Sequence, residues 1–218
     1  MNPAGRPDRP YKPDRPYKNV YWLGGSPCGG KSSAAEVLAE RHELSVYSCD
    51  AAFERHAGQA DERAPTLAML RAANLGELFM RPPPELARIA LAASIELFEF
   101  VTRDLSALGN GPVLAEGATL LPRLVARRAA PGRAAFITPG AAFQRRLYAA
   151  RPWARQVVGA APDPALAFDH WMRRDELFAR WVRRAARAER QPVLVVDGSA
   201  PLEATICWLE ETWGLKVP

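Results

Sequence analysis

The stretch Gly25-Ser26-Pro27-Cys28-Gly29-Gly30-Lys31-Ser32 fits the pattern G-x-x-x-x-G-K-[ST] at every fixed position. It follows the apolar run 20–23, which is suited to a buried strand, and precedes residues 33–42, which have the composition of a helix. A strand, a glycine loop and a helix in this order form a phosphate-binding unit, because the loop's backbone N–H groups turn toward a polyphosphate. The stretch therefore predicts a binding site for a nucleoside triphosphate.

Each part of this loop has an expected task. The glycines let the backbone approach a phosphate without a Cβ clash, Lys31 reaches the terminal phosphates, and the Ser32 hydroxyl can ligate Mg²⁺. Nucleotide contacts are expected from Gly25, Ser26, Pro27, Cys28, Gly29, Gly30, Lys31, Ser32 and Ser33. A glycine-rich turn that carries a lysine by chance is the alternative, and the flanking strand and helix disfavour it.

The loop and its context resemble the P-loop NTPases, and more narrowly the small P-loop kinases that act on nucleosides, shikimate, gluconate and similar metabolites. The resemblance implies an α/β protein with three α/β/α layers, a five-stranded parallel sheet in the order 2-3-1-4-5, and a small lid. It also implies ATP and Mg as cofactors and phosphoryl transfer to an alcohol group of a small molecule such as a nucleoside, a sugar acid or an antibiotic.

Length and composition favour one globular domain after an N-terminal extension. The chain has 218 residues, of which 48% are hydrophobic, enough for one sizeable core. Residues 1–18 contain a repeated Pro-Asp-Arg-Pro-Tyr-Lys unit and are expected to be disordered, with docking to an acidic partner or nucleic acid as the alternative. The kinase-like domain is expected over 19–218, with its lid at about 140–162.

Cysteine usage and charge limit the cellular setting and the partners. Three dispersed cysteines and no secretory signal favour the cytoplasm, and the best apolar stretch, 86–101, carries three charged residues that disfavour a membrane span. The formal charge is +5, but 121–192 holds fifteen Arg against five acids. No nucleic-acid-binding motif accompanies this charge, so a small-molecule acceptor is favoured over nucleic acid, in a monomer or homodimer.

Strand and helix patterns alternate along the rest of the chain. Further strands are expected at 44–49, 112–116, 133–138 and 191–196. Helices are expected from about 51, over 65–80 and 85–108, over 165–190, and from about 201. This alternation predicts a parallel sheet covered on both faces, with ligands bound at the carboxyl ends of its strands.

Acidic residues follow two of the predicted strands. Asp50 comes after the second strand and, by the resemblance, faces the acceptor hydroxyl as a catalytic group; capping of a helix that begins at Ala51 is the alternative. Glu116 ends the third strand and could hold Mg²⁺ or bind the acceptor. Thr119 and Arg71 are further candidates for acceptor contacts.

The segment after the fourth strand is rich in arginine and has the length of a lid. By the resemblance to the small P-loop kinases, Arg145 and Arg151 are expected to act in catalysis by stabilising transition-state charge, and Arg146 is expected to contact the nucleotide. Arg145 and Arg146 point about 100° apart on a helix, so at least one is expected at the surface. By the same resemblance, Asp197 and Gly198 are expected beside the adenine ring. The alternative for Asp197 is a structural role, in which Asp197 or Ser199 caps the last helix.

A second class of function stays open. A regulatory NTPase that acts through a protein or nucleic-acid partner would use the same phosphate loop. A GTPase would carry an Asn-Lys-x-Asp motif, which this sequence lacks, and the ABC-type signature is also missing. Transfer of phosphate to the end of a nucleic acid is a third hypothesis, motivated by the basic stretch 121–192.

Overall fold

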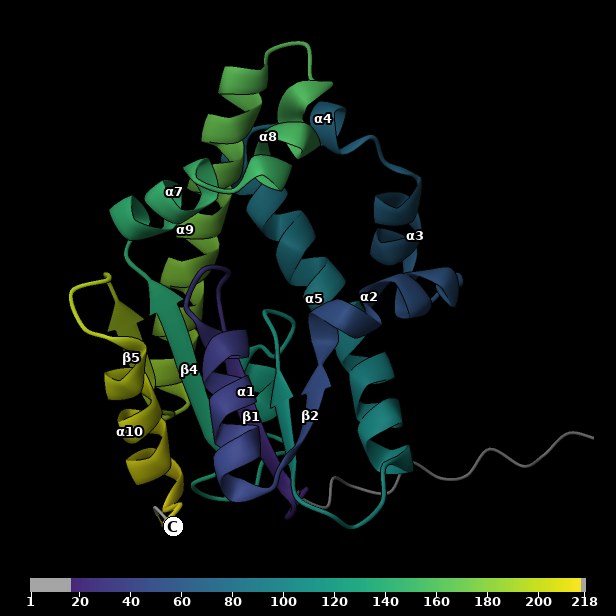
Figure 1. Cartoon of the computed structure of the whole chain (residues 1–218). Helices are drawn as coiled ribbons and strands as arrows, with labels where there is room; N and C mark the ends of the chain where they lie inside the picture. The colour runs from purple at the N-terminus through teal and green to yellow at the C-terminus, as the bar shows by residue number, and fades with distance from the viewer. Residues whose placement is uncertain (1–16, 217–218) are drawn as a thin grey trace, which may run out of the picture.

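Parallel strands form the centre of the protein, and helices cover both of their faces (Figure 1). The computed structural model describes residues 17–216, so the predictions made for residues 1–16 lie outside the described residues. The sheet consists of β1 (Val20–Gly25), β2 (Ser45–Ser48), β3 (Val113–Glu116), β4 (Ala134–Pro139) and β5 (Val193–Val196). Their order is β2-β3-β1-β4-β5, which confirms the predicted parallel sheet and its order.

The register brings particular strand ends together. Glu116, the last residue of β3, lies beside Leu23 of β1 on one side and Ser48 of β2 on the other. Gly25 at the end of β1 lies beside Ile137 of β4. The phosphate loop, the start of α2 and the end of β3 therefore meet at the carboxyl edge of the sheet.

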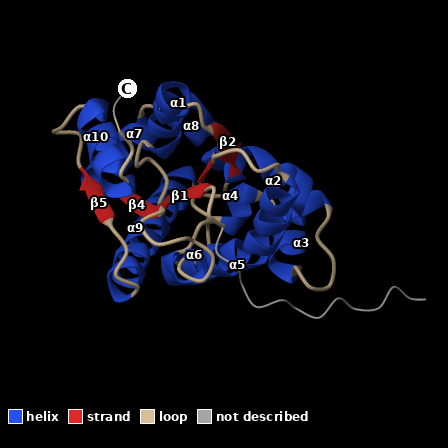
Figure 2. Ribbon diagram, turned by 90° about the horizontal axis from the view of Figure 1, so that it is seen from below, coloured by secondary structure: helices blue, strands red, loops and turns tan. Residues whose placement is uncertain are grey.

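The core lies in two layers because successive side chains of a strand point to opposite faces. Trp22 packs with the apolar side chains of α5 and α9, and Tyr21 and Leu23 pack with those of α1 and α10. Figure 2 shows α1 and α10 on one side of the strands and α5, α6 and α9 on the other. The three central strands are buried along their whole length, as their continuous apolar sequences predict.

The helices occupy the predicted gaps between strands. They are α1 (Lys31–His42), α2 (Cys49–Gly58), α3 (Pro65–Ala72), α4 (Leu75–Leu78), α5 (Pro83–Ala107), α6 (Pro122–Val125), α7 (Ala141–Ala149), α8 (Pro152–Gly159), α9 (Pro164–Ala188) and α10 (Leu202–Trp213). Figure 1 shows α4, α7 and α8 beyond the carboxyl ends of the strands, where a lid would lie. None of the helices within 17–216 has the length and apolar character that a membrane crossing needs.

The single helix predicted over 65–80 is wrong, because the chain forms α3 and α4 instead. Ala73 is extended, with φ −77° and ψ 138°, and Asn74 then caps α4 by accepting a hydrogen bond from the N–H of Gly76 at 3.0 Å. An Asn side chain competes with helical hydrogen bonding in this way. The break lets α4 contact α8 and α9.

The end of the proline-rich N-terminal segment packs on the core. Tyr17 stacks edge-on against Trp22 with 5.6 Å between ring centroids, and its hydroxyl donates to the carbonyl of Thr102 at 3.0 Å. Tyr17 also forms a bridge with Ala129. The chain is therefore anchored three residues before β1 begins.

Candidate active site

The phosphate loop has the backbone conformation of an anion-binding turn. Gly30 caps α1 with a left-handed backbone, φ 78° and ψ 14°, and Cys28 is also left-handed at φ 64°. Alternation between left- and right-handed residues points successive N–H groups to one side of the chain. Such a loop at the start of a twelve-residue helix is suited to hold the phosphates of a nucleotide.

Lys31 is folded back onto this loop. Its Nζ donates a hydrogen bond to the carbonyl oxygen of Ser26 at 2.9 Å, and the side chain is buried. Burial lowers the pKa of Lys31 below its ordinary value, while the negative charges of Asp50 and Glu116 oppose that shift. The buried ammonium group can donate charge-assisted hydrogen bonds to a phosphate at the loop.

Glu116 connects the loop to the neighbouring strand. Its Oε2 accepts a hydrogen bond from the Ser32 hydroxyl at 3.2 Å, its Oε1 accepts one from the Ser48 hydroxyl at 2.7 Å, and the residue is only 2% exposed. Carboxylate and hydroxyl oxygens are the ligands that Mg²⁺ prefers. The buried carboxylate and Ser32 thus fit a magnesium ion bound together with phosphate oxygens.

Other clusters that resemble a metal site are absent from the described part of the chain. No group of three or more His, Cys, Asp or Glu side chains is placed to hold a metal ion there. A metal at Ser32 and Glu116 would therefore need further oxygens from a phosphate and water, as is usual for Mg²⁺.

Asp50 lies in the first turn of α2 and is exposed. The alternative in which it caps a helix that starts at Ala51 is wrong, because α2 starts at Cys49 and the Ser48 hydroxyl accepts from the Ala51 N–H at 3.4 Å. Ser is a favoured residue at that position. Asp50 is thus free of the capping hydrogen bond, and its charge acts on Lys31.

The lid arginines have different surroundings. Arg151 lies over the rings of Tyr148 and Trp153, at 5.6 and 5.8 Å from their centroids. Burial raises the pKa of the Cys28 thiol, and the charge of Arg151 is the largest effect that opposes this rise. Arg151 therefore lies close to the phosphate loop, and a reactive thiolate at Cys28 is disfavoured.

Arg145 and Arg146 point in different directions, as the helical geometry predicts. Arg145 forms an ion pair with Asp169 of α9 at 2.8 Å, with 47% of its side chain exposed. Arg146 stacks over Phe143 at 5.3 Å, and its charge reaches Asp197. Arg145 is therefore held at the surface, while Arg146 borders the β5 loop.

The loop after β5 is a tight turn. Asp197 Oδ1 accepts a hydrogen bond from the Ser199 N–H at 2.9 Å, and the hydrogen bonds from Ser199 lower the pKa of Asp197. Gly198 has φ 85°, and a Cβ there would lie 2.5 Å from Phe143 Cε2. The alternative in which Asp197 or Ser199 caps α10 is wrong, because Pro201 precedes that helix and no side chain caps it.

Thr119 and Arg71 are separated from each other. Thr119 is buried between β3 and α6, where its carbonyl accepts from the Leu121 N–H at 2.9 Å. Arg71 is exposed at the end of α3. Arg71 borders a cavity of about 370 Å³, whereas Thr119 lies three residues after Glu116 in the chain and does not line this cavity.

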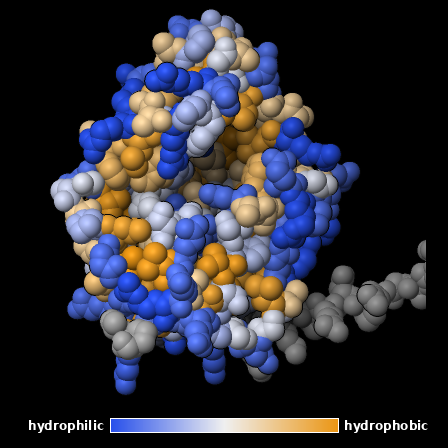
Figure 3. All heavy atoms as spheres, viewed as in Figure 1, coloured by the Kyte–Doolittle hydropathy of each residue, from blue (hydrophilic) through white to orange (hydrophobic). Residues whose placement is uncertain are grey.

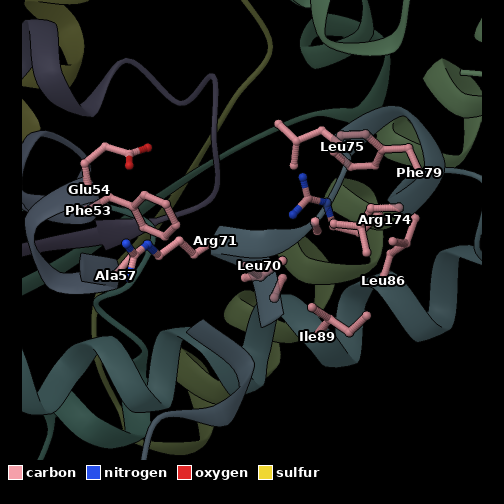
Figure 4. Close-up of a pocket in the computed structure, with 13 residues that line it drawn as sticks. Phe53, Glu54, Ala57, Leu70, Arg71, Leu75, Phe79, Leu86, Ile89 and Arg174 are labelled. Atoms are coloured by element: carbon pink, nitrogen blue, oxygen red, sulfur yellow. The ribbon is translucent and has the colours of Figure 1, made fainter. Parts of the chain in front are cut away.

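That cavity lies between α2, α3, α4, α5 and α9. Its walls are mainly apolar, and the charged side chains on it are Glu54, Arg71 and Arg174. Figure 3 shows the molecule hollowed in its upper half, with hydrophobic residues in the hollow, and Figure 4 shows the lining side chains. The lining residues are Phe53, Glu54, Ala57, Leu70, Arg71, Ala73, Leu75, Leu78, Phe79, Leu86, Ile89, Ala90 and Arg174.

Asp175 is a buried acid that the sequence analysis missed. It is 1% exposed, accepts a hydrogen bond from Gln144 Nε2 at 3.2 Å, and has Arg174 Nε 2.6 Å from its Oδ1. Burial raises the pKa of Asp175, and the charges of Arg174 and Lys31 oppose this rise. A signal was present, because Asp175 occupies the apolar face of α9 between Trp171 and Phe178.

Comparison with known proteins finds similarity to solved structures at low sequence identity. No family model matches the chain, and no curated protein sequence matches it. A structure described as a "putative kinase" from Chloroflexus aurantiacus has 16% sequence identity and a TM-score of 0.44, covering 90% of this chain and 96% of that one. A gluconokinase from Sinorhizobium meliloti 1021 has 16% identity and a TM-score of 0.40, covering 92% of this chain and 94% of that one.

The assignment of fold rests on the chain's own geometry. The strand order β2-β3-β1-β4-β5 places the glycine loop after the central strand and the Glu116 carboxylate beside it. Helices cover both faces of the sheet. The chain therefore has the three-layer arrangement of the P-loop NTPase fold.

Proposed function

We propose that this protein is a kinase that transfers the γ-phosphoryl group of ATP to a hydroxyl group of a small molecule. The observation that carries the proposal is the meeting of Ser32, Glu116 and buried Lys31 at the glycine loop, with Asp50 close enough for its charge to act on Lys31. A carboxylate outside the phosphate loop is what an acceptor hydroxyl requires for orientation and deprotonation.

The proposed reaction assigns a task to each side chain. The loop N–H groups and Lys31 hold the phosphates, and bound Mg²⁺, with Ser32 and Glu116 as its protein ligands, would offset phosphate charge. The acceptor oxygen forms a bond to the γ-phosphorus as the bond between that phosphorus and the β–γ bridging oxygen breaks. Asp50 accepts the acceptor's proton, and ADP leaves with the bridging oxygen.

The lid arginines would act on the nucleotide side of this reaction. Arg151 lies close enough to the loop for its charge to act on Cys28, so it is the stronger candidate for stabilising transferred charge. Arg146, together with Asp197 and Gly198, borders the side expected to receive the base. Arg145 would reach a phosphate only by giving up its ion pair with Asp169.

An ADP-release assay over a panel of nucleosides, sugars, sugar acids, hydroxylated antibiotics and apolar hydroxy acids tests the proposal. We expect at least one acceptor to stimulate ADP release and to appear as a phosphomonoester by ³¹P NMR. Asp50→Asn should lower the acceptor-stimulated kcat by about 100-fold while ATP still binds.

A matched control is Asp61→Asn, which removes an exposed carboxylate that pairs with Arg63 outside the site. It should leave turnover unchanged. Hydrolysis that responds to no acceptor, with equal rates for wild type and Asp50→Asn, would contradict a kinase and favour the regulatory NTPase.

A further inference from the structure

We propose that the cavity between α2, α3, α4, α5 and α9 is the acceptor site, and that it selects a hydroxylated molecule with an apolar body and an anionic group. This inference rests on the proposed phosphotransferase function and names the chemical class of its acceptor. The predicted acceptor is an apolar hydroxy acid and not a polyhydroxylated sugar acid.

The cavity is connected to the reacting groups through α2 and α9. Phe53 and Glu54 line the cavity and follow Asp50 by about one helical turn of α2. Asp50 therefore lies at the end of α2 that begins at the carboxyl edge of the sheet, next to this wall of the cavity. On α9, Arg174 lines the cavity, and the next residue, Asp175, lies near enough to Lys31 for the two charges to interact. The cavity therefore adjoins the helix that carries Asp50, and Cys28 of the loop packs against the cluster that contains the wall residues Leu78, Phe79 and Leu86.

The walls of the cavity are unsuited to a polyol. Five of the lining residues are large and apolar, namely Leu70, Leu75, Phe79, Leu86 and Ile89, and among residues 17–216 no Ser, Thr, Asn, Gln, Tyr or His lines the cavity. Each sugar hydroxyl left without a partner there would cost about 1–3 kcal/mol in lost hydration. An aromatic or aliphatic body would instead gain from leaving water.

The charges on the cavity wall favour an anion. Arg71 and Arg174 contribute two cations against the single carboxylate of Glu54. Within 17–216, Arg71 has no ion-pair partner, whereas the Nε side of Arg174 is engaged by Asp175 at 2.6 Å. Figure 4 shows the Arg174 guanidinium reaching between Leu70 and Leu75, and its Cζ lies 5.5 Å from the centroid of the Phe79 ring.

The arrangement of these groups matches the parts of such an acceptor. An arginine beside an aromatic ring can pair with a carboxylate while the ring contacts the apolar body of the same ligand. Asp50, at the end nearer the loop, would then face the hydroxyl group. The cavity volume, about 370 Å³, is near the lower end of the range for ligand sites and suits a small molecule.

Calorimetric titration of the full chain with four probes tests the inference. The probes are 3-phenyllactate and 2-hydroxyoctanoate as apolar hydroxy acids, gluconate as a polyhydroxylated acid, and 3-phenylpropane-1,2-diol as a neutral apolar alcohol. We expect at least one apolar hydroxy acid to bind about tenfold or more tightly than gluconate and the neutral diol, a difference of about 1.4 kcal/mol.

Variants locate the binding. Arg71→Gln and Arg174→Gln should each weaken binding of the apolar acid by about tenfold, whereas Arg174→Lys should retain part of it. Arg88→Gln is the matched control, because Arg88 is exposed on α5 next to Ile89 but does not line the cavity. Arg71 is itself exposed, so its variant is expected to fold even if a change at Arg174 disturbs Asp175.

Three results would overturn the inference. They are gluconate bound as tightly as the better apolar acid, no binding of either apolar acid, and an equal loss of apolar acid binding in Arg71→Gln and Arg88→Gln. Failure of the phosphotransferase proposal would give a different result. In that case the protein sample would bind an apolar acid but would not bind ATP.

Discussion

The Ser32 hydroxyl lies 3.2 Å from Glu116 Oε2, although 84 positions separate the two residues in the chain. They meet because β3 pairs directly with β1, so that the end of β3 reaches the start of the helix that follows the loop. Glu116 is also held by Ser48 of β2 at 2.7 Å. The carboxylate thus has two hydroxyl partners before any ligand binds.

Replacing this carboxylate should affect the metal-dependent part of nucleotide binding. In Glu116→Gln, we expect the gain in ATP affinity on adding Mg²⁺ to fall by about 10- to 100-fold, because a neutral amide is a weaker magnesium ligand. ATP titrations with and without Mg²⁺ measure this gain. Glu36→Gln, an exposed change on α1, is the control, and an equal Mg²⁺ effect in both variants would contradict the assignment.

Lys31→Met should weaken nucleotide binding but increase the free energy of unfolding. Phosphate binding should weaken by about tenfold or more, because a charge-assisted hydrogen bond is lost. The apo protein should gain about 1 kcal/mol in its free energy of unfolding at pH 7, because a buried charge is removed. ATP titration and urea unfolding measure the two effects.

The pH dependence of this gain has a definite sign. Burial lowers the pKa of Lys31 in the folded state, so below the unfolded pKa of about 10.4 the folded wild type bears the cost of the charge. That cost should shrink as pH rises toward 10.4. A gain in Lys31→Met that stays constant between pH 7 and pH 10 would show that the buried charge is not its cause.

Asp104 should stabilise the protein in a pH-dependent way. Its carboxylate accepts hydrogen bonds from Tyr47 at 2.6 Å and Arg55 at 2.7 Å, and lies 2.8 Å from Nε2 of buried His56. The hydrogen bonds from Arg55, and then those from Tyr47 and His56, hold the pKa of Asp104 well below its ordinary range, although burial opposes the shift. The cluster joins β2 and α2 to α5.

In Asp104→Asn, the free energy of unfolding at pH 7 should fall by about 1–3 kcal/mol. The lowered pKa means that this contribution is present above the unfolded pKa of about 3.9 and declines as pH falls through the folded pKa. The difference from wild type should therefore narrow between pH 5 and pH 2 in urea unfolding. Glu99→Gln, an exposed change on the same helix, should show no such difference at any pH.

Gly198→Ala tests the packing of the loop expected to face the base. Gly198 has φ 85° and its Cβ would collide with Phe143, whereas Gly214 has φ 63° and open space around it. Both alanine variants should lose about 1 kcal/mol for the left-handed backbone, and Gly198→Ala should lose at least another 1 kcal/mol for the contact. Thermal unfolding of the two variants compares these costs, and equal losses would contradict the close packing.

The sequence predicted the strands because their signals are local, whereas the order of the strands was implied by the resemblance to the small P-loop kinases. The glycine loop, the apolar runs and the strand-end acids each required only a short window. The break at Asn74 was missed because its side chain competes with a helix that propensity alone favours over 65–80. The two-helix region that results forms part of the cavity wall.

Contacts between distant segments explain the rest of what the sequence did not reveal. Asp175 was missed because its importance depends on burial beside Gln144 and Lys31, from other elements. Arg145, Arg146 and Arg151 were alike as sequence, but Asp169, Phe143 and the aromatic rings of the lid give them different environments. The position of each arginine relative to the phosphate loop therefore depends on its side-chain contacts.

Titration of ATP with Mg²⁺ into the purified full chain, followed by calorimetry, tests the central claim most directly. We predict saturable binding of one nucleotide per chain, weakened by about tenfold or more in Lys31→Met and unchanged in the exposed control Glu36→Gln. Circular dichroism of the same samples would establish that each is folded. No detectable binding by folded wild-type protein, or equal binding by wild type and Lys31→Met, would contradict the account.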